Sequence, residues 1–210
     1  MANHKRTKSN GDHKYIYVML SRTHTIPARL IRLYSKVPYS HTSIALDPEL
    51  TQMYSFARKG VWNPLNSGFI REDINSGVLG RDKNVYCSIY AVPVSDEQYE
   101  AFKKEIDHFV DNPNQYGYNF VGLFAAMLEV NIEDGKHFLC SQFVNHVFDK
   151  SGMPLFEGDN NLIKPYDFHL KLKNYRIYRG KLTEYRSFLE KRSYTKGMEW
   201  GEYVIPAYPA

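Results

Sequence analysis

One stretch of the chain decides how its fold is predicted: HFLCSQFVNHVFDKSG, residues 137–152. An apolar lead-in meets Cys140, after which apolar residues recur at helical spacing on the side that Cys140 occupies. We therefore predict a helix that begins at or just before Cys140 and ends at Ser151-Gly152, where the glycine provides a left-handed cap. At a helix N-terminus, unpaired N–H groups and the helix dipole stabilise a thiolate and can receive an oxyanion. On residue type alone, the alternative that Cys140 is a small buried apolar residue stays open.

A histidine opens the strand predicted at HTSIAL, residues 41–46. Alternation places His41, Ser43 and Ala45 on one face of this strand and the intervening residues on the other. We expect the small residues beside His41 to let a helix approach the sheet closely, so that the imidazole comes within reach of a helix side chain. A lone histidine in a strand is more often structural, so a catalytic role for His41 depends on Cys140 as well.

The remaining pattern predicts one α+β domain over residues 15–210, preceded by a disordered basic arm over residues 1–14. QMYSFA (52–57) follows the first strand after a turn and predicts an antiparallel hairpin with it. A capping box at Ser95–Gln98 begins a helix. Further strands are expected at 15–20, 85–94 and 175–180, and further helical segments at 25–35, 120–129 and 165–173.

Composition and cysteine content narrow the class of protein. Collagen, a coiled-coil rod and wholesale disorder are excluded by 43% hydrophobic and 24% charged residues in a chain of 210. No apolar run approaches the roughly 20 residues that cross a bilayer. We expect no signal peptide and therefore a cytoplasmic location. Cys87 and Cys140 are too few for a disulfide framework.

The net charge of +4 is unevenly distributed along the chain. Residues 1–14 and 164–210 are basic, whereas the residues between them carry a net negative charge. A nucleic-acid partner is disfavoured, because the part of the chain with the clearest folding pattern is acidic. Peripheral contact between the basic C-terminal segment and an anionic membrane stays open. No oligomeric state is predicted.

Five segments, in this order and spacing, carry a resemblance to a known superfamily. They are SHTSIAL (40–46), MYSFARKG (53–60), YGYNFVGLF (116–124), LCSQFV (139–144) and IKPYDF (163–168). Together they resemble the circularly permuted branch of the NlpC-like papain-fold superfamily, which includes YycO-like hydrolases and relatives of lecithin:retinol acyltransferase. In that branch the histidine precedes the cysteine, the reverse of papain, and such sites are recognised by geometry and not by chain order.

The resemblance implies a permuted papain-like α+β fold, in which a small antiparallel sheet packs against helices and the active site lies between them. It implies that Cys140 is the nucleophile, that His41 is its base and that a polar residue near positions 54–56 orients the imidazole. Relatives carry His, Glu, Asn or Gln at that third position. Here the strand offers Ser55, which shares a face with Met53 and Ala57. No cofactor is implied.

The chemistry expected of this site is thiolate attack on a carbonyl, with an acyl-enzyme intermediate. A peptide or another small acyl compound is then the substrate. We expect amide-bond hydrolysis first, as in a peptidase or amidase, and lipid acyl or ester hydrolysis or transfer second. A third class, a binding module that kept the pocket without catalysis, stays open because Ser55 departs from the family pattern.

Residues 58–84 are predicted to form a loop beside the active-site cleft, because Gly, Pro, Asn and Ser are frequent there. Trp62 and Phe69 in this loop suit a lid over the substrate, although Trp62 fits the core equally well. Tyr116 and Tyr118 are candidate pocket residues beside Cys140, the alternative being aromatic packing.

No metal site is predicted. His137, Cys140 and His146 lie close in sequence, but six residues separate Cys140 from His146, which turns their side chains about 240° apart on a helix. Cys87 lies within an alternating strand pattern and is interpreted as a core residue.

Overall fold

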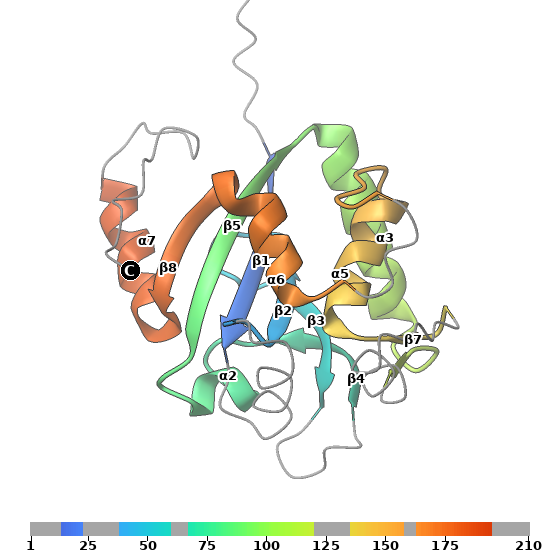
Figure 1. Cartoon of the computed structure of the whole chain (residues 1–210), viewed down its shortest axis with the longest axis horizontal. Coiled ribbons are helices and arrows are strands. Elements are labelled where there is room, and N and C mark those ends of the chain that lie inside the picture. Colours follow the sequence, from blue (N-terminus) through green and yellow to red (C-terminus); the bar gives the residue numbers. More distant parts are fainter. Residues whose placement is uncertain (1–13, 23–37, 60–66, 120–134, 158–162, 195–210) are drawn as a thin grey trace, which may run out of the picture.

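β-prone runs spread along the chain come together in one curled sheet of eight strands, seen in the computed structural model of the protein (Figure 1). The structure describes residues 14–22, 38–59, 67–119, 135–157 and 163–194. The order across the sheet is β7-β6-β4-β3-β2-β1-β5-β8, antiparallel except between β6 and β7. The strands are β1 (Lys14–Arg22), β2 (His41–Ala45), β3 (Met53–Arg58), β4 (Ser67–Glu72), β5 (Tyr86–Val94), β6 (Gly117–Tyr118), β7 (His137–Phe138) and β8 (Arg176–Lys181).

Helices are packed on both faces of this sheet. They are α2 (Gly77–Arg81), α3 (Asp96–Asp111), α5 (Cys140–Lys150), α6 (Pro165–Leu172) and α7 (Leu182–Tyr194), with a 3-10 turn, η1 (Lys173–Tyr175), after α6. The predicted capping box of α3 is confirmed, since Ser95 Oγ accepts from the Gln98 N–H and the Gln98 side chain accepts from the Ser95 N–H. The predicted end of α5 is also confirmed, because Gly152 has φ of +73°. The fold is mixed α+β.

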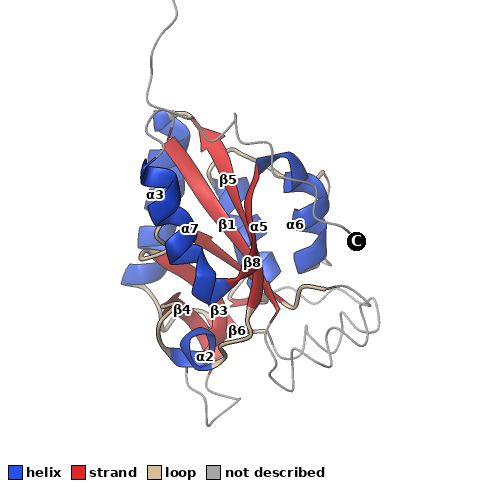
Figure 2. Cartoon of the chain, turned by 90° about the vertical axis from the view of Figure 1, so that its left-hand side faces the viewer, coloured by secondary structure: helices blue, strands red, loops and turns tan. Residues whose placement is uncertain are grey.

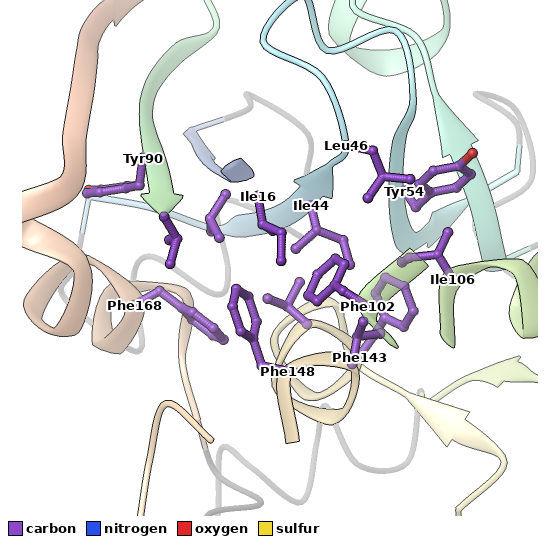
Figure 3. Packing of buried hydrophobic residues seen from close by; sticks show 14 of the residues in the cluster. Ile16, Ile44, Leu46, Tyr54, Tyr90, Phe102, Ile106, Phe143, Phe148 and Phe168 are labelled. Atoms are coloured by element: carbon purple, nitrogen blue, oxygen red, sulfur yellow. The ribbon is translucent and has the colours of Figure 1, made fainter. Parts of the chain in front are cut away.

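Alternation along the strands divides the buried residues into two cores. In β1, Val18 belongs to a core shared with α3, α5 and α6, which we call the α5-side core, and Figure 3 shows part of it. Its neighbour Met19 belongs to a second core, shared with α7, which we call the α7-side core. Figure 2 shows α6 and α7 on opposite sides of the sheet. Both faces of the central strands are therefore buried, as the apolar run at 15–20 indicates.

Three expectations about the fold are wrong. The sheet is not small, since it has eight strands. Residues 58–84 are not one irregular loop, because they contain β4 and α2. Asn75 and Ser76 directly precede α2, and Phe69 within β4 is buried against other rings of the α5-side core. The segment after β8 forms α7, which was not predicted.

Most of the other predicted elements are confirmed, and some lie outside the described residues. The hairpin, the strands at 15–20, 85–94 and 175–180, and the helical turns at 165–173 are confirmed. Lys14, placed in the predicted arm, lies in β1 and pairs with Glu100 at 2.7 Å. Residues 1–13 and the helices predicted at 25–35 and 120–129 lie outside the described residues. Within the described part of the chain, no helix is long and apolar enough to span a bilayer.

Candidate active site

A histidine–carboxylate pair lies where β2 begins and β4 ends. His41 is the first residue of β2, and Glu72 is the last residue of β4. Nε2 of His41 lies 2.6 Å from Oε1 of Glu72. The side chains are 15% and 5% exposed, so the pair is largely withdrawn from water. A contact this short between charged groups of low exposure is a strong electrostatic interaction.

Two serine hydroxyls hold the carboxylate of this pair. Ser43 Oγ on β2 donates to Oε1 of Glu72 at 3.1 Å, and Ser55 Oγ on β3 donates to the same oxygen. The strand register explains the meeting, because β3 lies between β2 and β4 and pairs Met53 with Glu72. Ser55 is two residues from Met53 and therefore points to the same face of the sheet as Glu72.

Cys140 meets the other side of the imidazole. It is the first residue of α5 and is 8% exposed. Its sulfur interacts with the His41 imidazole and raises the pKa of that ring. The start of α5 is fixed by Gln142, whose side-chain oxygen accepts from the Leu139 N–H at 2.8 Å. Cys140 carries a free thiol. The N-terminal turn of α5 thus places a free thiol beside His41.

The reason predicted for the close approach of α5 is wrong. Ala45, one of the small residues of β2, packs in the α7-side core. Its neighbour Ile44 packs in the α5-side core together with Phe143 of α5. The helix therefore lies against the larger side chains of β2. His41 and Cys140 are the first residues of β2 and α5, and their side chains interact there.

The protonation states follow from these contacts. Burial by itself would lower the pKa of His41, but the charge of Glu72 and the interactions with the Cys140 sulfur raise it well above its usual value. Burial would raise the pKa of Glu72, but His41 and the hydroxyls of Ser55 and Ser43 lower it. The pair is therefore a carboxylate and an imidazolium, and the imidazolium has the cysteine sulfur as its second neighbour.

The residue predicted to orient His41 is not the one found beside it. The contact to Nε2 comes from Glu72, and Ser55 donates to Glu72 instead. The sequence prediction of a loop over residues 58–84 provides no strand after β3, and therefore no position from which Glu72 could be expected to reach His41. The signal was present in SGFIRE, a short β4 pattern with a buried Phe69 and a terminal acidic residue.

Phe69 and Tyr116, two residues predicted to line the substrate site, both contact aromatic side chains. Phe69 is not a lid residue, since it is 6% exposed and its ring lies among those of Tyr54, Phe56, Phe109 and Phe143. Tyr116 bonds through its hydroxyl to Nε2 of His108 at 2.8 Å and packs on Phe109.

The remaining candidate residues of the substrate and metal sites lie in different parts of the chain. Tyr118 lies in β6 and packs against the α5-side core. Trp62 lies outside the described residues. His146, considered as a metal ligand, faces Glu105 of α3 at 3.3 Å. Across the ranges that the structure describes, no group of three or more His, Cys, Asp or Glu side chains is placed to hold a metal ion.

The chain was compared with protein-family models and with curated proteins. No family model matches the chain, and no curated protein matches it significantly. The function must therefore be argued from the arrangement of Cys140, His41 and Glu72.

Proposed function

We propose that the protein is a cysteine hydrolase with a permuted papain-like fold, in which Cys140, His41 and Glu72 form the catalytic triad. One observation carries the proposal: the imidazole of His41 interacts both with the carboxylate of Glu72, at 2.6 Å, and with the sulfur of Cys140. A nucleophile next to a base, with the base next to an orienting group, is the arrangement that defines catalytic triads on many unrelated folds. Since Glu72 occupies Nε2, Nδ1 is the ring nitrogen left for the thiol.

The first half of the reaction forms the acyl-enzyme. The sulfur of Cys140, paired with the imidazolium of His41, attacks the carbonyl carbon of the substrate. As the bond to the leaving group breaks, His41 gives its proton to the leaving group. Backbone N–H groups in the first turn of α5 are suited to the oxygen that becomes negative in this step. The products are a thioester on Cys140 and the free leaving group.

The second half of the reaction releases the acyl group. Neutral His41 takes a proton from water, the water oxygen bonds to the thioester carbon, and the thiolate of Cys140 leaves. Glu72 stabilises the imidazolium that is restored. If another hydroxyl or amine replaces the water, the same steps transfer the acyl group, as the resemblance to acyltransferases suggests.

An amide is the substrate class that this site favours. An amine is a poor leaving group unless it is protonated, and an imidazolium between Glu72 and Cys140 is a proton donor placed for that purpose. An ester depends less on such a donor, so lipid ester hydrolysis or transfer is the second candidate. A non-catalytic binding module is less well supported, because Glu72, and not Ser55, contacts the imidazole as an orienting group.

The proposal is tested by trapping the acyl-enzyme. We expect p-nitrophenyl acetate to give a burst of p-nitrophenol with one acetyl group on Cys140, identified by peptide mass spectrometry. Cys140→Ala should abolish the burst, and Cys87→Ala is the matched control, because Cys87 is the other free thiol and lies in the α7-side core. A fluorogenic peptide-amide library then tests the substrate class. Acetylation that is absent, or equal in wild type and His41→Ala, would contradict the proposal.

A further inference from the structure

The carboxylate of Glu72 is held by more than its histidine. Its Oε1 atom receives Nε2–H of His41 and the hydroxyls of Ser43 and Ser55, all on a group that is 5% exposed. The three donors come from β2 and β3. An ionised carboxylate only accepts hydrogen bonds, so both hydroxyls must donate to it.

We propose that Ser43 and Ser55 are positioning residues, which keep Glu72 ionised and aimed at His41 and so act on Cys140 through these two groups. The catalytic meaning of this inference rests on the proposed hydrolase function. The arrangement of the two hydroxyls around the carboxylate of Glu72 is independent of that function.

The physical argument starts from the cost of burying a carboxylate. A carboxylate withdrawn from water takes up a proton unless donors replace the water it has lost. A neutral Glu72 would remove one of the two groups that stabilise the His41 imidazolium. The two hydroxyls oppose that change, since both lower the pKa of Glu72 together with His41, against the effect of burial.

The same hydroxyls restrict the direction of the carboxylate. Ser55 and Ser43 belong to neighbouring strands, so their donors approach Oε1 from fixed positions of the sheet. His41 then meets an oxygen that is already anchored, which costs less entropy than ordering a free glutamate side chain. Among the described residues, the titratable groups with the largest effects on the pKa of His41 are Glu72 of β4 and Cys140 of α5, and the residue paired with His41 on β1 is the uncharged Ser21.

The first arm of the experiment is a carboxyl ¹³C NMR titration of glutamate-labelled protein, with Glu72→Gln used for assignment. We expect the Glu72 midpoint to rise by about one pH unit in Ser55→Ala, and further in Ser43→Ala/Ser55→Ala. Ser55→Thr keeps a hydroxyl and should retain the wild-type midpoint. Ser151→Ala is the matched control, because it removes a buried hydroxyl that bonds to the Val147 carbonyl at the other end of α5.

The second arm is a double-mutant cycle on the rate of Cys140 acylation by p-nitrophenyl acetate. We expect Ser55→Ala to slow acylation about tenfold in the wild-type background and by much less in the Glu72→Gln background, because Ser55 acts through Glu72. In Ser55→Ala, the acid limb of the rate profile should move to higher pH together with the Glu72 midpoint. If the Ser55 hydroxyl were purely structural, its removal would slow acylation equally in both backgrounds and leave the acid limb of the rate profile at the same pH.

The outcomes separate this inference from the proposed function. An unchanged Glu72 midpoint in folded Ser43→Ala/Ser55→Ala overturns the inference. If that variant does not fold, Ser43→Ala alone must raise the midpoint, and an unchanged value overturns it equally. Equal slowing in both backgrounds also overturns it. If p-nitrophenyl acetate never acylates Cys140 but the Glu72 midpoint rises as expected, the hydrolase proposal fails while the hold of the two hydroxyls on Glu72 stands.

Discussion

His41 and His146 each contact a glutamate, and their imidazoles respond in opposite ways. His41 lies 2.6 Å from Glu72, and its pKa is raised although burial opposes the change. His146 of α5 lies 3.3 Å from Glu105 of α3, but its pKa is lowered, because burial outweighs the charge of Glu105. A glutamate near a histidine is therefore not enough to keep the imidazole charged.

The difference lies in what surrounds each carboxylate. Glu72 is 5% exposed and receives two hydroxyls besides His41, whereas Glu105 is 24% exposed. His41 also has the Cys140 sulfur as a second neighbour that favours its charge, while the charge of Lys150 opposes that of His146. A buried and anchored carboxylate holds a proton on its histidine, and a partly exposed one at longer range does not.

The largest contrast is expected in catalysis. His41→Ala should slow the acylation of Cys140 by p-nitrophenyl acetate about 10³-fold, because it removes the partner that activates the thiol. His146→Ala, on the same helix as Cys140 but outside the site, should change the rate only about twofold. Burst kinetics measure both variants. A comparable loss in the two would mean that His41 has no special role.

Stability should separate the two glutamates. Removing the Glu72 carboxylate leaves His41 without its buried partner, so Glu72→Ala should lower the free energy of unfolding by about 3 kcal/mol. Glu105→Ala should cost less than about 1 kcal/mol, since its pair is partly exposed and longer. Urea denaturation near neutral pH measures the difference, and similar losses in both variants would remove the contrast.

The pH dependence of that stability has a defined sign. Because the pKa of His41 is raised in the folded protein, His41 contributes its full stabilisation below about pH 6.5. This contribution is lost as the pH rises through the pKa that His41 has in the folded protein. The lowered pKa of Glu72 stabilises it fully above about 4.3, and this contribution is lost as pH falls through the folded value. The difference in unfolding free energy between wild type and Glu72→Gln should therefore be largest between about pH 4.3 and 6.5. A difference that does not vary with pH would contradict the ion pair.

The smallest expected effect is in the titration of the rings themselves. Histidine ring NMR should give His41 a midpoint above about 6.5 and His146 a midpoint below it. Glu72→Gln should lower the His41 midpoint and leave that of His146 unchanged. If the two rings titrate together, burial and contact affect them equally and the comparison is wrong.

Local patterns were enough to predict the elements that carry Cys140 and His41. The helical spacing after Cys140 and the alternation from His41 are features of a few neighbouring residues, and the structure has a helix and a strand there. The capping box that begins α3 is a local pattern of the same kind. α7 could also have been predicted, because Leu182, Tyr185 and Leu189 recur at helical spacing.

Glu72 could not be assigned in the same way. Its meeting with His41 joins residues 31 apart and depends on the order of β2, β3 and β4 in the sheet, which no local pattern specifies. Ser55 was selected by alternation, and it does point to the correct face, but its hydroxyl reaches the carboxylate and not the imidazole. Alternation predicts the face of a residue, whereas the contact depends on strand register.

The central claim is that His41 holds the thiol of Cys140 in a reactive state. The most direct test is iodoacetamide labelling near pH 6, with Cys140 and Cys87 quantified separately by peptide mass spectrometry. Cys87 is the internal reference, because burial alone raises the pKa of its thiol. We predict that Cys140 is labelled at least about tenfold faster in wild type than in His41→Ala, and much faster than Cys87. Equal labelling of Cys140 in wild type and His41→Ala would contradict the account.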